Sequence, residues 1–174
     1  MSQDFFSYLI ESINKKNSLL CVGLDPQGFG QPDENIIEKI VANNKRLIDE
    51  TIQYTACYKP NIAFYEAFGH MGIKALEETI GLIPEDTPVI LDTKRSDIGN
   101  TAGAYARGIF GNLHVHATTL NPYLGKESVL PFLEYKVSNP KWFRTPVRLS
   151  IISFGKKFLH RIGLFIKFIS SASQ

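Results

Sequence analysis

The sequence is poor in cysteine and lacks a long apolar segment. Its two cysteines, Cys21 and Cys57, lie inside apolar stretches without CxxC spacing, so we expect buried, reduced thiols rather than a disulfide framework or a metal site. Residues 1–12 carry acids where a signal peptide would carry basic residues, and no uncharged apolar run approaches the ~18 residues that cross a bilayer. These absences favour a cytoplasmic protein without a membrane partner.

Acidic residues are missing from the C-terminal part of the chain. All 17 Asp and Glu residues lie at or before Glu134. Residues 1–135 have 11 Lys and Arg against those 17 acids, a net charge of −6, whereas residues 136–174 have 8 Lys and Arg and a net charge of +8. A basic tail rich in Phe and Ile also occurs in proteins that bind nucleic acid or a membrane surface. We instead interpret residues 141–174 as an aberrant segment from a shifted reading frame or a misassembled gene, and expect no nucleic-acid partner.

Residues 4–135 alternate between strand and helix patterns, in a chain of 174 residues that is 44% hydrophobic. Apolar runs typical of buried strands occur at 18–24, 56–60, 87–94 and 114–121. Apolar residues at helical spacing occur at 4–17, 33–52, 67–80, 100–110 and 126–135. This alternation predicts an α/β fold with a parallel sheet, and four βα units are half of a (β/α)8 TIM barrel. We therefore predict that residues 1–140 are the N-terminal part of such a barrel.

Polar side chains follow each of the four predicted strands. They are Asp25, Lys59, the pair Asp92 and Lys94, and Asn121. Because the carboxyl ends of parallel strands meet at one edge of a sheet, we expect these side chains to converge. Asp92 and Lys94 are two residues apart and therefore point to the same side of a strand, where a flanking carboxylate keeps a lysine cationic and ready to donate a proton. On spacing alone, an exposed ion pair worth ~0–1 kcal/mol explains the same pattern.

The segment that contains this pair also carries a family motif. The sequence DTKRSDIGNT at 92–101 has the form D-x-K-x-x-D-I-x-N-T, and LCVGLDP at 20–26, YKPN at 58–61 and NPYLGKESVLPF at 121–132 accompany it in order. On these four segments the chain resembles the orotidine 5′-phosphate decarboxylases of the bacterial branch with longer chains. The resemblance ends near residue 140, as in a truncated or frameshifted member.

The resemblance implies an activity, which is decarboxylation of orotidine 5′-phosphate to UMP in pyrimidine biosynthesis. It implies a charged catalytic network of four residues, which are Lys59, Asp92, Lys94 and Asp97. Lys94 would donate the proton to C6 of the pyrimidine, and no metal or other cofactor would be needed. Substrate-binding roles would fall to Asp25, Lys59, Thr101 and Asn121. The functional unit would be a homodimer in which Asp97 and Thr101 reach the partner's site.

Two other hypotheses remain open from the sequence. Metal-dependent sugar-phosphate decarboxylases and synthases share a similar D-x-K-x-x-D strand, although Lys59 and the continuation at 98–101 favour the nucleotide enzyme. His114 and His116 alternate along one strand, but no third ligand has suitable spacing, so we predict no metal site. The second hypothesis is an inactive fragment, because nothing after residue 140 has the strand and Gly-rich turn of a phosphate cradle.

Overall fold

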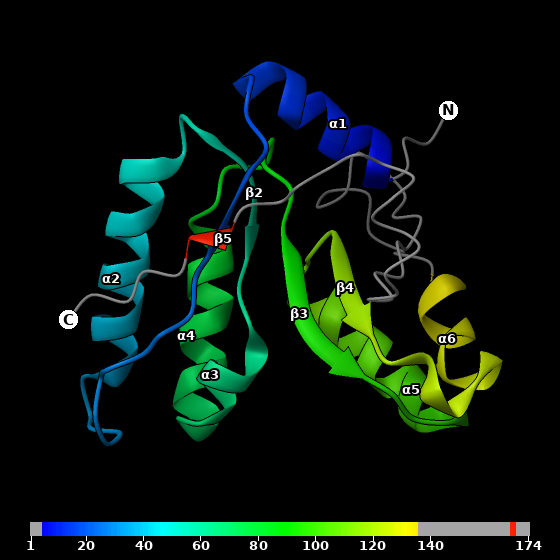
Figure 1. Cartoon of the computed structure of the whole chain (residues 1–174). Coiled ribbons are helices and arrows are strands. Elements are labelled where there is room, and N and C mark those ends of the chain that lie inside the picture. Colours follow the sequence, from blue (N-terminus) through cyan, green and yellow to red (C-terminus); the bar gives the residue numbers. More distant parts are fainter. Residues whose placement is uncertain (1–4, 136–167, 170–174) are drawn as a thin grey trace.

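The computed structural model describes residues 5–135 and 168–169, and Figure 1 shows an α/β arrangement around parallel strands. The strands are β1 (Leu20–Gly23), β2 (Thr55–Lys59), β3 (Ile90–Arg95), β4 (Ala117–Leu120) and β5 (Phe168–Ile169). Parallel pairing gives the orders β2-β1-β5 and β3-β4. Isolated parallel bridges, Tyr58 to Val89 and Asn61 to Asp92, join β2 to β3. The described strands therefore run β5-β1-β2-β3-β4 in one open sheet, as expected for part of a (β/α)8 barrel.

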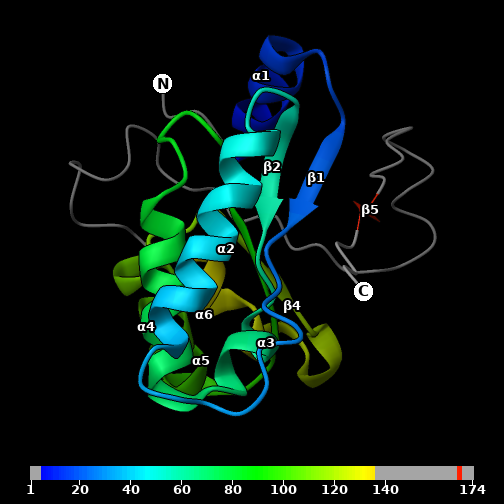
Figure 2. The same cartoon turned by 90° about the vertical axis from the view of Figure 1, so that its left-hand side faces the viewer.

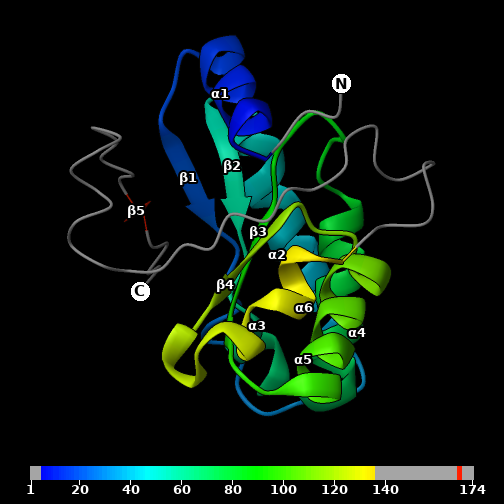
Figure 3. The same ribbon diagram turned by 90° about the vertical axis from the view of Figure 1, so that its right-hand side faces the viewer.

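Apart from the N-terminal helix, the longer helices lie on one face of this sheet (Figures 2 and 3). The helical segments are α1 (Phe5–Lys16), α2 (Ile36–Thr51), α3 (Ile62–Glu66), α4 (Gly69–Gly81), α5 (Gly99–Ala106), the π-helical η1 (Arg107–Asn112), the 3-10 turns η2 (Pro122–Leu124) and η3 (Lys126–Ser128), and α6 (Leu130–Leu133). The strand residues Val22, Tyr58 and Leu91 share one buried cluster with residues of these helices, such as Ile40 and Leu76. Burial of these apolar side chains fixes the helices on the sheet.

The opposite face of the sheet is apolar at the amino ends of the strands. There Cys21, Cys57, Ile90 and Ala117 form a second buried cluster with Phe5 and Leu9 of α1. We call the four strand residues the amino-end row, and the two α1 residues are its cap. The register pairs Cys21 with Cys57 and Ile90 with Ala117, so these side chains lie side by side. Figure 1 shows α1 across this end of the strands. Both cysteines are buried and free, as the sequence predicted.

The same face of the sheet continues toward the carboxyl ends of the strands. Two residues beyond the amino-end row, the same face presents Lys59, Asp92 and Thr119, because successive side chains on a strand alternate between faces. We call these three residues the carboxyl-end row. Along the strands, the polar carboxyl-end row therefore follows the apolar amino-end row that α1 covers.

Most predicted elements are confirmed, with shifted ends. All four predicted strands exist; β1, β3 and β4 are shorter than expected, and β2 is shifted by one residue. The helix predicted from residue 33 begins at Ile36, because the Asp33 carboxylate accepts a hydrogen bond from the Asn35 amide in the preceding turn. The helix predicted at 67–80 is α4, and the separate short α3 before it was missed. The side chain of Asn61 caps α3 by accepting a hydrogen bond from the Ala63 amide.

Two helical predictions were wrong in part. Helical spacing at 4–17 predicts one apolar face formed by Phe5, Leu9, Ile10 and Ile13, but Ile10 is 55% exposed while Ser12 is buried. The Ser12 hydroxyl donates to the Ala56 carbonyl at 2.8 Å, so a polar contact turns that side of α1 toward β2. The segment at 126–135 is not one helix but the turn η3 followed by α6. Residues 141–174, predicted as an aberrant tail, lie outside the described residues apart from β5.

No helix in the described ranges is both long enough and apolar enough to cross a membrane.

Candidate active site

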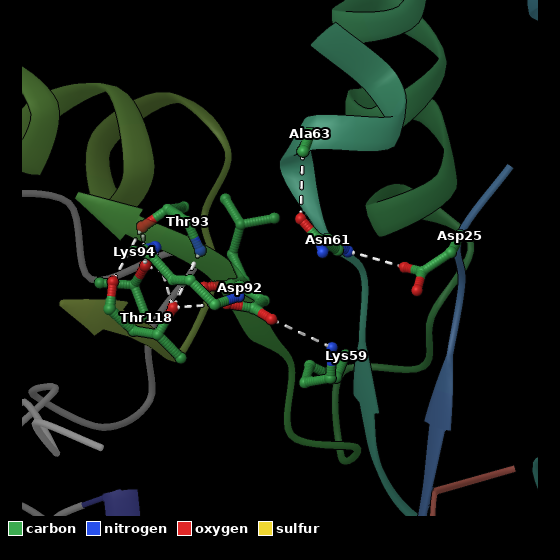
Figure 4. A network of polar contacts seen from close by, with 10 residues as sticks. Asp25, Lys59, Asn61, Ala63, Asp92, Thr93, Lys94 and Thr118 are labelled. Carbon is green, nitrogen blue, oxygen red and sulfur yellow. Dashed lines mark hydrogen bonds and ion pairs between the residues drawn. The ribbon is translucent and has the colours of Figure 1, made fainter. Parts of the chain in front are cut away.

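The centre of the site is the Asp92 carboxylate at the carboxyl end of β3. Its Oδ1 atom lies 2.7 Å from Lys94 Nζ, and its Oδ2 atom lies 3.4 Å from Lys59 Nζ on β2 (Figure 4). The Asp92 residue is only 8% exposed. The site therefore holds one carboxylate between two ammonium groups from neighbouring strands, as predicted for these three residues.

The surroundings of Asp92 favour its ionised form. Burial raises the pKa of this carboxyl, but hydrogen bonds from Lys94 and Thr119 and the charges of Lys59 and Lys94 outweigh burial and bring its pKa below the usual value. A hydrogen bond to a carboxylate stabilises the charged form. Asp92 is therefore an anion at neutral pH and a fixed counter-charge for both lysines.

Thr119 on β4 also belongs to the site, although the sequence analysis missed it. Its hydroxyl donates to Asp92 Oδ1 at 2.7 Å. Threonine is a common strand residue, so the run ATTL gives no chemical signal by itself. A signal was present in the alternation, because Thr119 lies two residues before the predicted site residue Asn121 and therefore faces the same side.

Lys94 leaves the strand in an unusual backbone conformation. Its φ of 48° lies in the left-handed region, which residues other than glycine rarely adopt. Its side chain is 60% exposed, whereas that of Lys59 is 16% exposed. The Lys94 ammonium thus touches Asp92 and remains open to a ligand above the end of the sheet.

Asp25 lies at the same end of the sheet, after β1. Its Oδ1 atom accepts a hydrogen bond of 2.9 Å from the Asn61 amide (Figure 4). Burial raises the pKa of this carboxyl above its usual value, although the Asn61 amide and the Lys59 charge act in the opposite direction. Asp25 and Asp92 therefore have pKa values shifted in opposite directions within one site.

Three predicted site residues are not joined to Asp92 within this chain. Asp97 Oδ1 accepts a hydrogen bond from the Ile98 amide at 2.8 Å, and among the described residues no ion pair links Asp97 to a lysine. Thr101 is exposed in the first turn of α5. Asn121 is exposed, and its side chain accepts a hydrogen bond from the Tyr123 amide. The structure thus brings together three members of the predicted four-residue network, and the role of Asp97 across a subunit boundary stays a prediction.

Most of the sequence matches a known protein family. The profile described as "Orotidine 5'-phosphate decarboxylase / HUMPS family" matches residues 18–152, more than half of the chain. The chain belongs to this family. Within the family, a curated protein named orotidine 5′-phosphate decarboxylase from Parabacteroides distasonis is 47% identical over 132 residues, covering 73% of this chain and 47% of that protein.

Two solved structures of the family also resemble the chain. The OMP decarboxylase of Leishmania donovani is 47% identical with a TM-score of 0.68, and the match covers 78% of this chain and 50% of that one. The UMP synthase of the same organism is 39% identical with a TM-score of 0.70, covering 95% of this chain and 34% of that one. The chain therefore spans about half the length of the curated relatives that it matches.

His114 and His116 are the candidate metal ligands that the sequence offers on one predicted strand. Among residues 5–135, no group of three or more His, Cys, Asp or Glu side chains has an arrangement that could hold a metal ion. His116 Nδ1 accepts a hydrogen bond from the Val89 amide at 3.1 Å, and its ring lies 5.1 Å from that of Tyr8. These contacts tie the start of β4 to β3 and α1, at the end of the sheet opposite Asp92.

Proposed function

We propose that this chain carries the decarboxylation centre for orotidine 5′-phosphate, and that it forms UMP and carbon dioxide. The observation that carries the proposal is the Lys59–Asp92–Lys94 arrangement at the carboxyl end of the sheet, within a segment that belongs to the decarboxylase family. Two curated relatives that are 47% identical to the chain bear the name of this enzyme. The metal-dependent sugar-phosphate reaction lacks such support among them.

The proposed chemistry uses the two charges of the Asp92–Lys94 pair. Loss of carbon dioxide from C6 leaves an electron pair in the plane of the pyrimidine ring. A positioned ammonium group stabilises this developing charge and then protonates C6, and we assign that role to Lys94. The Asp92 anion pairs with the Lys94 ammonium, and it would lie near the departing carboxylate. The reaction needs no metal or organic cofactor, because a single ammonium group both stabilises and protonates the carbanion.

We assign the remaining predicted residues to binding and assembly. Asp25 and Lys59 would hold the ribose hydroxyls, and Asn121 would contact the substrate from the end of β4. Asp97 and Thr101 would complete the site of a partner subunit in a homodimer, which is compatible with their position outside the Asp92 contacts of their own chain. A cytoplasmic setting stays a prediction, and the free thiols of Cys21 and Cys57 are compatible with a reducing compartment.

The test is loss of orotidine 5′-phosphate absorbance with the 174-residue chain, in buffer that contains EDTA. We expect turnover under these conditions, and Lys94→Ala should lower kcat by at least about a thousandfold because it removes both charge stabilisation and the proton. The matched control is Lys74→Ala, since Lys74 is an exposed lysine that pairs with Glu77 on α4. Its kcat should match that of the parent chain.

Three outcomes would count against the proposal. Strict dependence on a divalent metal would favour the sugar-phosphate enzymes. Near-normal turnover by Lys94→Ala would remove Lys94 from its role. A folded parent chain without turnover would favour the inactive fragment.

A further inference from the structure

The backbone conformation of Lys94 depends on contacts with neighbouring residues. A φ of 48° is unfavourable for a lysine because its Cβ crowds the backbone, and such conformations persist only where surrounding contacts hold them. The left-handed conformation of Lys94 occurs where β3 stops following the register of β4, since the pairing shifts between Leu91 and Arg95. The peptide groups in this gap need hydrogen-bond partners outside the regular ladder.

One hydroxyl supplies these partners. The amides of Thr93 and Lys94 both donate to Thr119 Oγ1, each at 3.0 Å. The same hydroxyl donates its single proton to Asp92 Oδ1 at 2.7 Å, and Lys94 Nζ contacts that oxygen too. A threonine hydroxyl has one proton and two lone pairs, so all three of its hydrogen-bonding positions are used.

The direction of these hydrogen bonds is fixed by chemistry. An amide N–H can only donate and an ionised carboxylate can only accept, so the Thr119 proton must point at Asp92. Thr119 is 4% exposed, which leaves little room for water to replace a lost hydroxyl. The charged groups that face Asp92 are Lys94 on its own strand, Lys59 on β2 and Asp25 after β1.

We propose that Thr119 is a positioning residue, which holds Lys94 in its left-handed conformation and fixes the Asp92 oxygen against which the Lys94 ammonium rests. The relevance of this contact to catalysis rests on the proposed decarboxylase function. Thr119 acts through Asp92 and Lys94 and does not itself take part in proton transfer. Without its hydroxyl, two amides and a carboxylate oxygen lose a partner at once, and the Lys94 backbone can relax toward ordinary strand geometry.

The neighbouring Thr118 provides a matched control. It is the same residue type on the same strand and is also buried, but its hydroxyl donates to the Leu91 carbonyl at 2.8 Å and lies 2.9 Å from the Thr93 hydroxyl, with neither contact on Asp92 or on the Lys94 amide. Thr118→Val and Thr119→Val both remove one buried hydroxyl at constant shape. Both variants leave buried polar groups without a partner and should lose thermal stability, so a stability loss alone cannot account for a change of kcat in one variant only.

The experiment compares Thr119→Val, Thr119→Ser and Thr118→Val in the 174-residue chain. We expect Thr119→Val to lower kcat roughly tenfold to a hundredfold with little change in KM, because binding groups are kept while the proton donor is displaced. Thr119→Ser keeps the hydroxyl and should restore kcat to near the parent value. Thr118→Val should leave kcat within about twofold of the parent, because the Thr118 hydroxyl bonds the Leu91 carbonyl and the Thr93 hydroxyl rather than Asp92 or the Lys94 amide. Should Thr119→Val not fold, Thr119→Ala replaces it.

A second readout does not depend on turnover. Carboxyl-carbon NMR titration should show a raised Asp92 pKa in Thr119→Val only, since a hydrogen bond to the anion has been removed. The backbone chemical shifts of Lys94, which report its φ, should change in the same variant. If Thr119→Val matches Thr118→Val in the Asp92 titration and the Lys94 shifts, the positioning role is overturned. If the parent chain lacks turnover while these NMR differences appear, the proposed function fails and the positioning contact stands.

Discussion

The two ends of the same sheet face have opposite characters. The amino-end row, which consists of Cys21, Cys57, Ile90 and Ala117, is apolar and sealed by α1. The carboxyl-end row, which consists of Lys59, Asp92 and Thr119, is polar and surrounds a buried carboxylate. Along β2, β3 and β4 the two rows are only two positions apart, with a single residue between them. The comparison shows that alternation selects the face, whereas position along the strand decides whether a side chain packs or reacts.

The largest effect should follow from a change at the centre of the carboxyl-end row. Asp92→Asn keeps the shape of the side chain but removes the counter-charge of Lys59 and Lys94. We expect kcat for orotidine 5′-phosphate to fall by at least about a hundredfold, because a preorganised charge is lost from the site. The measurement is steady-state turnover of the variant and the parent chain.

A matched control for that change is Asp49→Asn. Asp49 is an exposed aspartate that pairs with Lys45 on α2. Its kcat should equal that of the parent chain. Equal turnover in Asp92→Asn and Asp49→Asn would contradict a chemical role for the carboxyl-end row.

The next effect concerns the cap of the amino-end row and is one of stability. Phe5 is 3% exposed and packs against the strand residues of that row. Phe5→Ala should lower the free energy of unfolding by about 3–5 kcal/mol, through lost burial and the cavity that remains. Urea unfolding, followed by circular dichroism, measures this change.

The adjacent Phe6 is the control for the same experiment. Phe6 is 38% exposed, so Phe6→Ala should cost well under half as much as Phe5→Ala. If both variants lose the same free energy, α1 does not seal the amino-end row through one face. The difference between the two phenylalanines therefore measures the contribution of the cap.

The smallest effect is a pH dependence at the amino end of β4. Burial lowers the pKa of His116 from 6.5 to about 4. Because the unfolded chain binds a proton at a higher pH than the folded chain, the stabilising contribution is complete above pH 6.5 and is lost as the pH falls to about 4. We expect a loss on the order of 1–3 kcal/mol over this window, measured by urea unfolding at several pH values.

Two variants assign this slope to its source. His116→Gln should flatten the stability profile between pH 6.5 and about 4. His70→Gln, at an exposed residue of α4, should retain the parent slope. A parent-like slope in His116→Gln would show that the titrating group lies elsewhere. The amino end of the sheet would then have no acid response of its own.

Much of the site was readable from local sequence because its geometry is local. Asp92 and Lys94 are two residues apart, so strand alternation predicted a shared side, and they do contact each other although Lys94 departs from strand geometry. The position of Lys59 followed from the rule that parallel strands end at one edge. The buried cysteines followed in the same way from apolar neighbours on both sides.

Other features depended on contacts between segments that are distant in sequence. Thr119 joins the site only because β4 lies beside β3 in one register, which brings its hydroxyl to the amides of Thr93 and Lys94. Ile10 is exposed because the Ser12 hydroxyl bonds to the Ala56 carbonyl, and helical spacing alone gave no sign of this. The short α3 was missed because five residues are too few for a helical repeat of apolar positions to stand out.

The sequence by itself determined the order of β1 to β4, the family of the chain and the Asp-x-Lys pair, because each depends on residue types at short, regular spacing. Only the tertiary structure decided which hydroxyl supports that pair and which end of the sheet α1 closes. Those outcomes depend on the register between strands and on packing across the sheet, where the free energy comes from residues far apart in the chain.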